Sequence, residues 1–292
     1  MRKIIAFLLV LSLVFLSCGC TKEKLTAQVT ATTAPVYEFA VRICQGTDIQ
    51  VSRLINENVS CLHDYTLQTS QMRALESSEL ILISGAGLED FLNDVLPASD
   101  KIVDTSQGIT LLCGEHEHDH EDHGHDHSED PHIWLSPANA KVIARNIYDG
   151  LVARYPQHQA VFQKNLETLT ADLTKLEQYA AQQLSNITCR ELITFHDGFA
   201  YLADAFDFHI LFAIEEESGS EASARELIEI ANLIQAHNLS CIFTEENGST
   251  SASLILSAET GVHIYSLDMA MGDRDYFGAM YHNIDTLKEA LQ

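Results

Sequence analysis

Short hydrophobic runs alternate with amphipathic stretches along the first part of the chain. The run at residues 80–85 is almost wholly apolar, and residues 68–78 before it have apolar positions at helical spacing. Strand, helix and strand in this order indicate a parallel β-sheet. The runs that we expect to form strands in this half are residues 36–44, 59–62, 80–85, 101–106 and 109–113.

Residues 137–184 predict two consecutive helices. Pro137 suits the first turn of a helix, and residues 138–154 then have apolar side chains at helical spacing. Residues 157–184 continue with this periodicity and contain no Gly or Pro. At a rise of ~1.5 Å per residue, the second helix would be about 40 Å long. We expect it to connect two lobes rigidly.

A second alternation of strands and helices follows, without a repeat of the first half that the sequence alone reveals. The predicted fold class is therefore α/β: two (β/α) lobes with parallel sheets, joined by a long rigid backbone helix, with a cleft between the lobes. We expect strands at residues 191–195, 209–214, 241–246 and 262–268, and helices at about 198–206, 221–237, 249–260 and 275–291.

The first twenty residues have the pattern of a secretory signal sequence. Arg2 and Lys3 precede an apolar run at residues 4–16, which is too short to span a bilayer comfortably. The run ends in small residues and two cysteines, as in a bacterial lipobox, so we expect a lipid anchor on Cys20 or Cys18. Plain secretion is the alternative. In either case the mature protein is expected outside the cytoplasm, at the outer face of the cell membrane or in the periplasm.

These patterns divide the chain into five segments. They are a signal sequence with lipobox at 1–20, a polar tether at 21–35, an N-terminal α/β lobe at 36–155, a connecting helix at 156–185 and a C-terminal α/β lobe at 186–292.

Five cysteines remain beyond the signal sequence. Export permits disulfides, and the plausible pairs, each near neighbouring predicted strands, are Cys44 with Cys61 and Cys189 with Cys241. None of the five forms a CxxC pair of the kind that binds zinc.

The charge balance excludes a nucleic-acid-binding protein. The 17 Lys and Arg residues oppose 42 Asp and Glu residues, which gives a formal net charge of −25, whereas a nucleic-acid binder must neutralise phosphates. The unusual residue is histidine, because six of the 14 lie between residues 116 and 127. This composition points to metal binding.

The histidine-rich loop, residues 115–130, contains six histidines and eight acidic residues but no Lys or Arg. Such a segment cannot bury enough apolar surface to fold. Imidazoles that alternate with carboxylates can bind metal weakly near neutral pH, and an inert spacer is the alternative. The auxiliary weak zinc ligands expected here are His116, His118, His120, His123, His125 and His127.

Four possible metal ligands lie where ligands bind in parallel α/β sheets, beyond the carboxyl ends of strands. His63 and His196 each follow a predicted strand, Asp268 ends one, and His132 lies in the segment DPHIWL before the long helices. Three imidazoles and one carboxylate form a tetrahedral ligand set that suits zinc. A single histidine beside apolar residues is more often a hydrogen-bonded packing residue. The coincidence of four candidates favours a metal site.

Six motifs occur in order along the chain. They are HDYTL at 63–67, SGAGLEDFL at 84–92, DPHIWLSP at 130–137, FHDGFAYLADAF at 195–206, IFTEENGS at 242–249 and YSLDMAMGDRDYFGAMYHNIDTLKEAL at 265–291. Together they resemble the zinc/manganese solute-binding proteins of ABC importers, over residues 36–291. The resemblance implies two (β/α) lobes that hold one metal ion at their interface, with residues matching His63, His132, His196 and Asp268 as ligands.

The same resemblance implies zinc as the ion. The family position that matches His196 usually carries histidine in zinc members and a carboxylate in manganese members. A histidine-acid loop before the DPH motif is also characteristic of zinc members. Ser136 departs from the family, which often has Asp there, and we expect this change to alter a helix cap and not a ligand.

The implied function is that of an extracytoplasmic zinc-binding protein, not an enzyme, that captures Zn²⁺ and delivers it to an ABC permease and its ATPase subunit. We expect a monomer, bound to the membrane through its lipid anchor. The alternatives are a manganese-binding homologue and a surface zinc buffer or adhesin-like protein. A zinc hydrolase is the weakest alternative: residues 116–120 match HExxH, but that motif requires an ordered helix, which this charged, glycine-flanked run does not favour.

Overall fold

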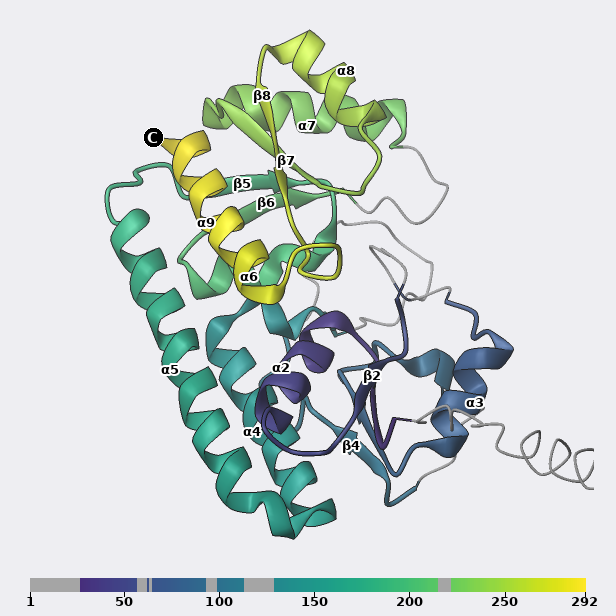
Figure 1. The fold of residues 1–292 in the computed structure, drawn as a ribbon. Helices are drawn as coiled ribbons and strands as arrows, with labels where there is room; N and C mark the ends of the chain where they lie inside the picture. Colours follow the sequence, from purple (N-terminus) through teal and green to yellow (C-terminus); the bar gives the residue numbers. More distant parts are fainter. Residues whose placement is uncertain (1–26, 57–61, 63–64, 93–98, 113–128, 215–221) are drawn as a thin grey trace, which may run out of the picture.

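Two lobes lie along one long helix in the computed structural model of the chain (Figure 1). The predictions for the signal sequence, Cys18, Cys20, His63 and the six loop histidines lie outside the described residues and stay predictions. The structure describes residues 27–56, 62, 65–92, 99–112, 129–214 and 222–292.

The N-terminal lobe is built on a sheet of four parallel strands in the order β2-β1-β3-β4. Helices α2 and α4 pack against this sheet and against each other. The elements of this lobe are β1 (Val29–Ala31), α2 (Ala34–Cys44), β2 (Val51–Arg53), α3 (Thr69–Ser77), β3 (Leu80–Ile83), the 3₁₀ turn η1 (Asp90–Leu92), β4 (Ile102–Asp104), the 3₁₀ turn η2 (Ile133–Leu135) and α4 (Pro137–Arg154).

The C-terminal lobe repeats this arrangement. Its four parallel strands lie in the order β6-β5-β7-β8, so in both sheets the first strand lies between the second and the third. The elements are β5 (Glu191–Thr194), the 3₁₀ turn η4 (Asp197–Phe199), α6 (Ala200–Ala205), β6 (His209–Ala213), α7 (Ala224–His237), β7 (Cys241–Glu245), α8 (Ser251–Thr260), β8 (His263–Leu267) and α9 (Tyr276–Leu291).

Helix α5 (Gln159–Gln183), which follows the 3₁₀ turn η3 (Pro156–His158), connects the lobes. It packs against α2 and α4 of the N-terminal lobe and against α9 of the C-terminal lobe. Its buried face carries Phe162, Leu166, Leu169, Leu173 and Leu176 at helical spacing. This face joins the hydrophobic core that runs through both lobes, whereas a smaller cluster lies under α7 and α8.

Polar contacts attach α5 to both lobes. Arg42 of α2 forms an ion pair with Asp172. Near the C-terminus of α5, Tyr179 donates a hydrogen bond of 2.6 Å to Asp285 of α9, and Lys288 of α9 donates one of 2.7 Å to Gln183. The helix is therefore bonded to each lobe as well as packed against it.

The predicted elements from residue 137 onward are confirmed. The long helix was expected at residues 157–184 and is found at Gln159–Gln183, and all four strands of the second half occur within one or two residues of the expected bounds. Ser136 caps α4, since its hydroxyl accepts a hydrogen bond of 3.4 Å from Asn139 N. No helix in the described segments is long and apolar enough to cross a membrane.

The prediction for residues 36–44 is wrong, because this run forms most of helix α2 and not a strand. Its buried side chains Val36, Phe39, Ala40 and Ile43 have helical spacing, and Pro35 occupies the first turn. The β-branched and aromatic composition hid this periodicity.

The expected tether at residues 21–35 is wrong for its last part, because β1 is fully buried there and α2 begins at Ala34. The central strand of the sheet was thus missed. Residues 109–112 form no regular strand, and neither does Leu62, the one described residue of the expected strand at 59–62. Strand β2 is found earlier, at Val51–Arg53.

The disulfide prediction for Cys189 with Cys241 is wrong in this structure, and Cys61, the predicted partner of Cys44, lies outside the described residues. Among the described residues, Cys44, Cys189 and Cys241 are free thiols. Burial raises the pKa of Cys44 to about 12, which makes that thiol a poor nucleophile at neutral pH.

Candidate metal centre

Two of the predicted ligands, His132 and His196, meet across the lobes. His132 precedes η2 in the N-terminal lobe, and His196 follows β5 in the C-terminal lobe. Their Nε2 atoms are 3.5 Å apart, and their rings are edge-to-face with centroids 5.1 Å apart. Two nitrogens bound to one tetrahedral zinc at ~2.05 Å would lie about 3.4 Å apart. The observed separation fits two ligands of one ion.

Asp130 orients the imidazole of His132. Its Oδ1 lies 2.8 Å from the Nδ1 atom of His132 and accepts a hydrogen bond of 2.8 Å from the His132 backbone N–H. A proton on Nδ1 leaves Nε2 as the free lone pair, which is the tautomer that a metal ligand needs. Both side chains are at least nine-tenths buried, so water competes little for this contact.

Gly198 allows the two rings to approach. A Cβ atom at this position would lie 2.7 Å from Cδ2 of His196 and 2.9 Å from Cε1 of His132. It would also lie 2.6 Å from Cε of Met269. Any larger residue would therefore push one ring away from the other.

Aromatic residues beside the site tie the two lobes together. The indole of Trp134 donates a hydrogen bond of 2.8 Å to the carbonyl of Met269 in the opposite lobe. The hydroxyl of Tyr276 donates one of 2.9 Å to the carbonyl of Trp134, and the Tyr276 backbone N–H donates one of 2.7 Å to Glu38. These residues fix the segment that follows His132 against the segment that follows Asp268.

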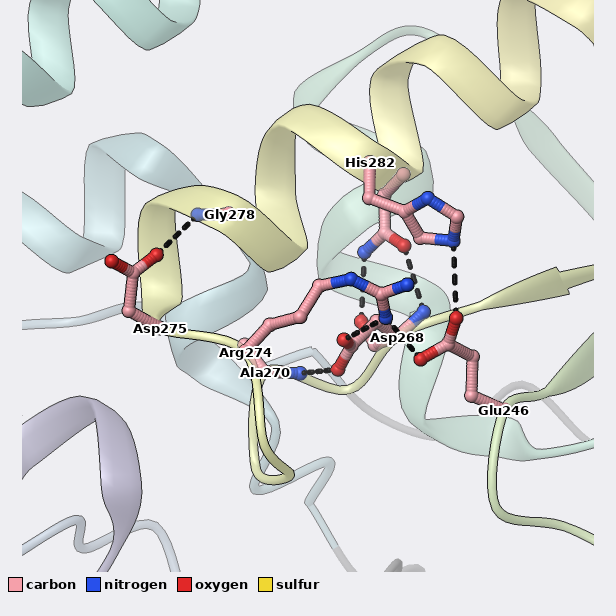
Figure 2. Close-up of polar contacts among 8 residues, drawn as sticks. Glu246, Asp268, Ala270, Arg274, Asp275, Gly278 and His282 are labelled. Atoms are coloured by element: carbon pink, nitrogen blue, oxygen red, sulfur yellow. Dashed lines mark hydrogen bonds and ion pairs between the residues drawn. The ribbon is translucent and has the colours of Figure 1, made fainter.

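Asp268, the third described candidate, lies directly after β8 and is buried. Figure 2 shows its carboxylate between the backbone of Ala270 and the guanidinium of Arg274. Its Oδ1 accepts a hydrogen bond of 2.8 Å from Ala270 N, and its Oδ2 accepts one of 3.0 Å from Arg274 Nη1. Asn283 holds the Asp268 backbone through a hydrogen bond of 2.7 Å to its N–H and another of 2.7 Å to its carbonyl.

Glu245, at the end of β7, is a carboxyl group that the sequence prediction missed. Burial raises its pKa to about 7, His132 lowers the pKa and Asp268 raises it further, so the group lies within electrostatic reach of both candidates. It ends its strand just as His196 and Asp268 follow theirs. The strand-end criterion did not single it out, because the expected strand at residues 241–246 extended past it.

In the described part of the chain, no three His, Cys, Asp or Glu side chains lie close enough together to hold a metal ion. The structure pairs His132 with His196, and it places Asp268 in an ion pair with Arg274. Asp197, which begins η4, has its Oδ1 3.9 Å from Nδ1 of His196. His63 lies outside the described residues.

An open pocket of about 250 Å³ adjoins this region. It is lined in part by Leu62, Leu88, Glu129 and Pro131. Leu62 and Pro131 are the neighbours in sequence of His63 and His132.

Comparisons with known proteins identify a family model, curated relatives and solved structures that are similar to this chain. The model of the family described as zinc-uptake complex component A, periplasmic (ZnuA), matches residues 29–290. The zinc-binding lipoprotein AdcA of Streptococcus pneumoniae is 28% identical over 309 residues, which cover 99% of this chain and 61% of AdcA. A putative metal-binding protein of Treponema pallidum is 26% identical over 257 residues, which cover 84% of this chain and 81% of that protein. The chain thus spans about three-fifths of the length of AdcA.

Solved structures with the same fold include ZnuA itself. Its crystal structure matches with a TM-score of 0.78 and 28% identity and covers 91% of this chain and 100% of ZnuA. The Zn(II)-bound ZnuA-like domain of Streptococcus pneumoniae AdcA matches with a TM-score of 0.76 and 26% identity over 90% of this chain and 98% of the domain.

Proposed function

The chain belongs to the family of the periplasmic zinc-uptake complex component A, and on this premise we propose that it captures Zn²⁺ outside the cytoplasm and delivers it to an ABC permease with its ATPase subunit. The observation that carries the proposal is the pair His132 and His196, whose Nε2 atoms are 3.5 Å apart across the lobes. His63 and Asp268 complete the proposed ligand set.

Zinc fits this set better than manganese does. Three imidazoles and one carboxylate suit a borderline ion, whereas manganese prefers a shell that is rich in oxygen. The relatives point the same way, since AdcA is named a zinc-binding lipoprotein and its ZnuA-like domain was crystallised with Zn(II). The manganese alternative is therefore not favoured.

The finer points of location are part of the same proposal. The protein is lipid-anchored through Cys20 or Cys18, acts as a monomer at the outer face of the membrane, and binds further zinc weakly through the histidine-rich loop. The name of AdcA as a lipoprotein supports the anchor. The protein is a carrier and not an enzyme, as the family implies.

Zinc competition titration tests the proposal. The protein, purified metal-free, is titrated against a chelator of known affinity, alongside His132→Ala and His196→Ala. We expect one tight site, which each substitution weakens by more than about 100-fold because it removes a ligand.

His263→Ala is the matched control, because His263 is exposed and lies at the opposite end of β8 from Asp268. Its affinity for zinc should equal that of the wild type. A wild-type protein without a tight site, or a loss of affinity of equal size in all three variants, would contradict the proposal.

A further inference from the structure

Arg274 supplies a positive charge to the carboxylate that the proposed site uses. Its Nη1 donates a hydrogen bond of 3.0 Å to Oδ2 of Asp268, and the same atom forms a short ion pair with Oε2 of Glu246. Figure 2 shows the guanidinium lying between the two carboxylates. One nitrogen thus bridges a proposed ligand and a second acid that is outside the ligand set.

The three groups differ in exposure. The side chain of Asp268 is 7% exposed, that of Glu246 is 26% exposed and that of Arg274 is 41% exposed. Asp268 is held by its backbone and by Ala270, so it cannot follow the arginine outward. Arg274 reaches in from the loop between β8 and α9, and its side chain is the most exposed of the three.

Glu246 is a second ion-pair partner for Arg274. It follows β7, and its Oε1 lies 3.3 Å from Nε2 of His282 on α9. An arginine that leaves Asp268 therefore keeps a complete ion pair. Its transfer breaks no contact with Glu246, since the same guanidinium nitrogen already pairs with that carboxylate.

A metal ion and the guanidinium of Arg274 would compete for the carboxylate of Asp268. Both are cations, and a carboxylate shared between them binds each more weakly, because the two positive charges repel at short range. In the arrangement described here the guanidinium holds the carboxylate.

Resting on the proposed zinc function, we propose that Arg274 is a built-in competitor of the transported ion. It neutralises Asp268 in the empty protein and moves entirely to Glu246 when the ion arrives. The competition lowers the affinity of the site and speeds release of the ion, which suits a protein that must give up its cargo.

The substitution Arg274→Gln distinguishes competition from simple positioning. If Arg274 competes, its removal should tighten zinc binding about tenfold, a difference of ~1.4 kcal/mol, and should slow zinc release to a chelator in stopped-flow measurements. If Arg274 only orients Asp268, its removal should weaken binding. Arg225→Gln, an exposed position on α7, makes the same charge change elsewhere in the lobe and should alter neither quantity.

Glu246→Gln should change zinc affinity in the opposite direction from Arg274→Gln, and it also tests the mechanism. Without Glu246 the guanidinium remains on Asp268, so zinc binding should weaken about tenfold. In the double variant Arg274→Gln/Glu246→Gln, the loss of Glu246 should have no further effect, because its influence passes through Arg274. Effects that add in the double variant would mean a long-range charge effect and would overturn the inference.

Asp268→Ala separates this inference from the proposed function. If the wild type binds zinc tightly and Asp268→Ala does not, the ligand assignment stands whatever Arg274 does. Unchanged or weaker binding by Arg274→Gln in that situation would overturn the competitor role alone. A wild type without tight binding would overturn the proposed function itself.

Discussion

At the scale of single residues, the orientation of His132 depends on Asp130, which binds both the ring and the backbone of that histidine. A histidine whose far nitrogen is held in place presents its other nitrogen to a metal at a fixed angle. The contact spans two residues in sequence and is buried. Asp130 is therefore the residue outside the ligand set whose loss should harm binding most directly.

Asp130→Ala should lower zinc affinity about 10–100-fold, the usual effect of removing a hydrogen-bond partner of a metal-bound histidine. Asp130→Asn should retain most of the affinity, because the amide oxygen can still accept from Nδ1 of His132. Chelator competition measures both values. Equal losses in the two variants would show that the charge of Asp130, and not its hydrogen bond, is what matters.

The candidate residues illustrate what the sequence can reveal. His132 was predicted from its place in the segment DPHIWL. His196 was predicted from its position after a strand, because parallel strands bring their carboxyl ends to one edge. Glu245 obeys the same rule and was overlooked. Arg274 could not have been predicted, because its partners depend on the path of the loop between β8 and α9. The pattern of hydrophobic residues in the sequence does not determine the path of a loop.

At the scale of elements, α9 begins at a defined cap that also anchors the loop of Arg274. The side chain of Asp275 accepts a hydrogen bond of 2.6 Å from Gly278 N, as Figure 2 shows. The first N–H groups of a helix have no partner within the helix, so such a cap stabilises its start. The loop and the helix are thus joined at a fixed point.

Asp275→Ala should reduce the free energy of unfolding by about 1 kcal/mol. Asp275→Asn should reduce it by much less, because asparagine caps helices as well as aspartate does. Urea denaturation of the metal-free protein measures both values. A larger loss for Asn than for Ala would contradict capping as the role of Asp275.

The elements that the sequence predicted poorly lie at the start of the N-terminal lobe. β1 and β2 have three residues each, too few to show an alternating pattern, and β1 lies in a Thr-rich stretch that reads as a tether. α2 was assigned as a strand on its composition, although its buried positions follow the helical period. Longer elements such as α5 were predicted well because their periodicity is repeated over several turns.

At the scale of the whole molecule, stability should depend on pH through the buried carboxyl of Glu89. Burial raises its pKa from 4.5 to about 7, against hydrogen bonds from Thr32, Gly85 and Ser84 that lower it. Between these values the folded protein keeps a proton that the unfolded chain has released. The stability that this group contributes is therefore full below pH 4.5 and is lost as the pH rises to 7, by up to about 3 kcal/mol.

Glu89→Gln should remove this part of the pH dependence, because glutamine does not ionise. Between pH 5 and pH 7.5, urea denaturation in the presence of a chelator should show a steeper loss of stability for the wild type than for the variant. Glu229→Gln, an exposed position on α7, is the control and should follow the wild type. Parallel curves for all three proteins would contradict a raised pKa at Glu89.

Deletion of residues 115–129 should leave one tight zinc site and remove several weak ones. The deletion spares His63, His132, His196 and Asp268. Weak sites on a segment that must become ordered before it binds lose affinity to that ordering. Zinc stoichiometry should fall toward one per chain, with little change in the tightest Kd, while circular dichroism confirms the fold. Loss of the tight site would mean that the loop supplies one of its ligands.

The attachment of α5 to both lobes limits how the empty and loaded proteins can differ. A helix of 25 residues that is packed against and bonded to both lobes holds them in place, so the lobes do not swing apart. Small-angle X-ray scattering should give nearly the same radius of gyration with and without zinc. The overall shape of the molecule then cannot tell a permease whether zinc is bound. The permease must instead recognise local changes in the surface around the cleft.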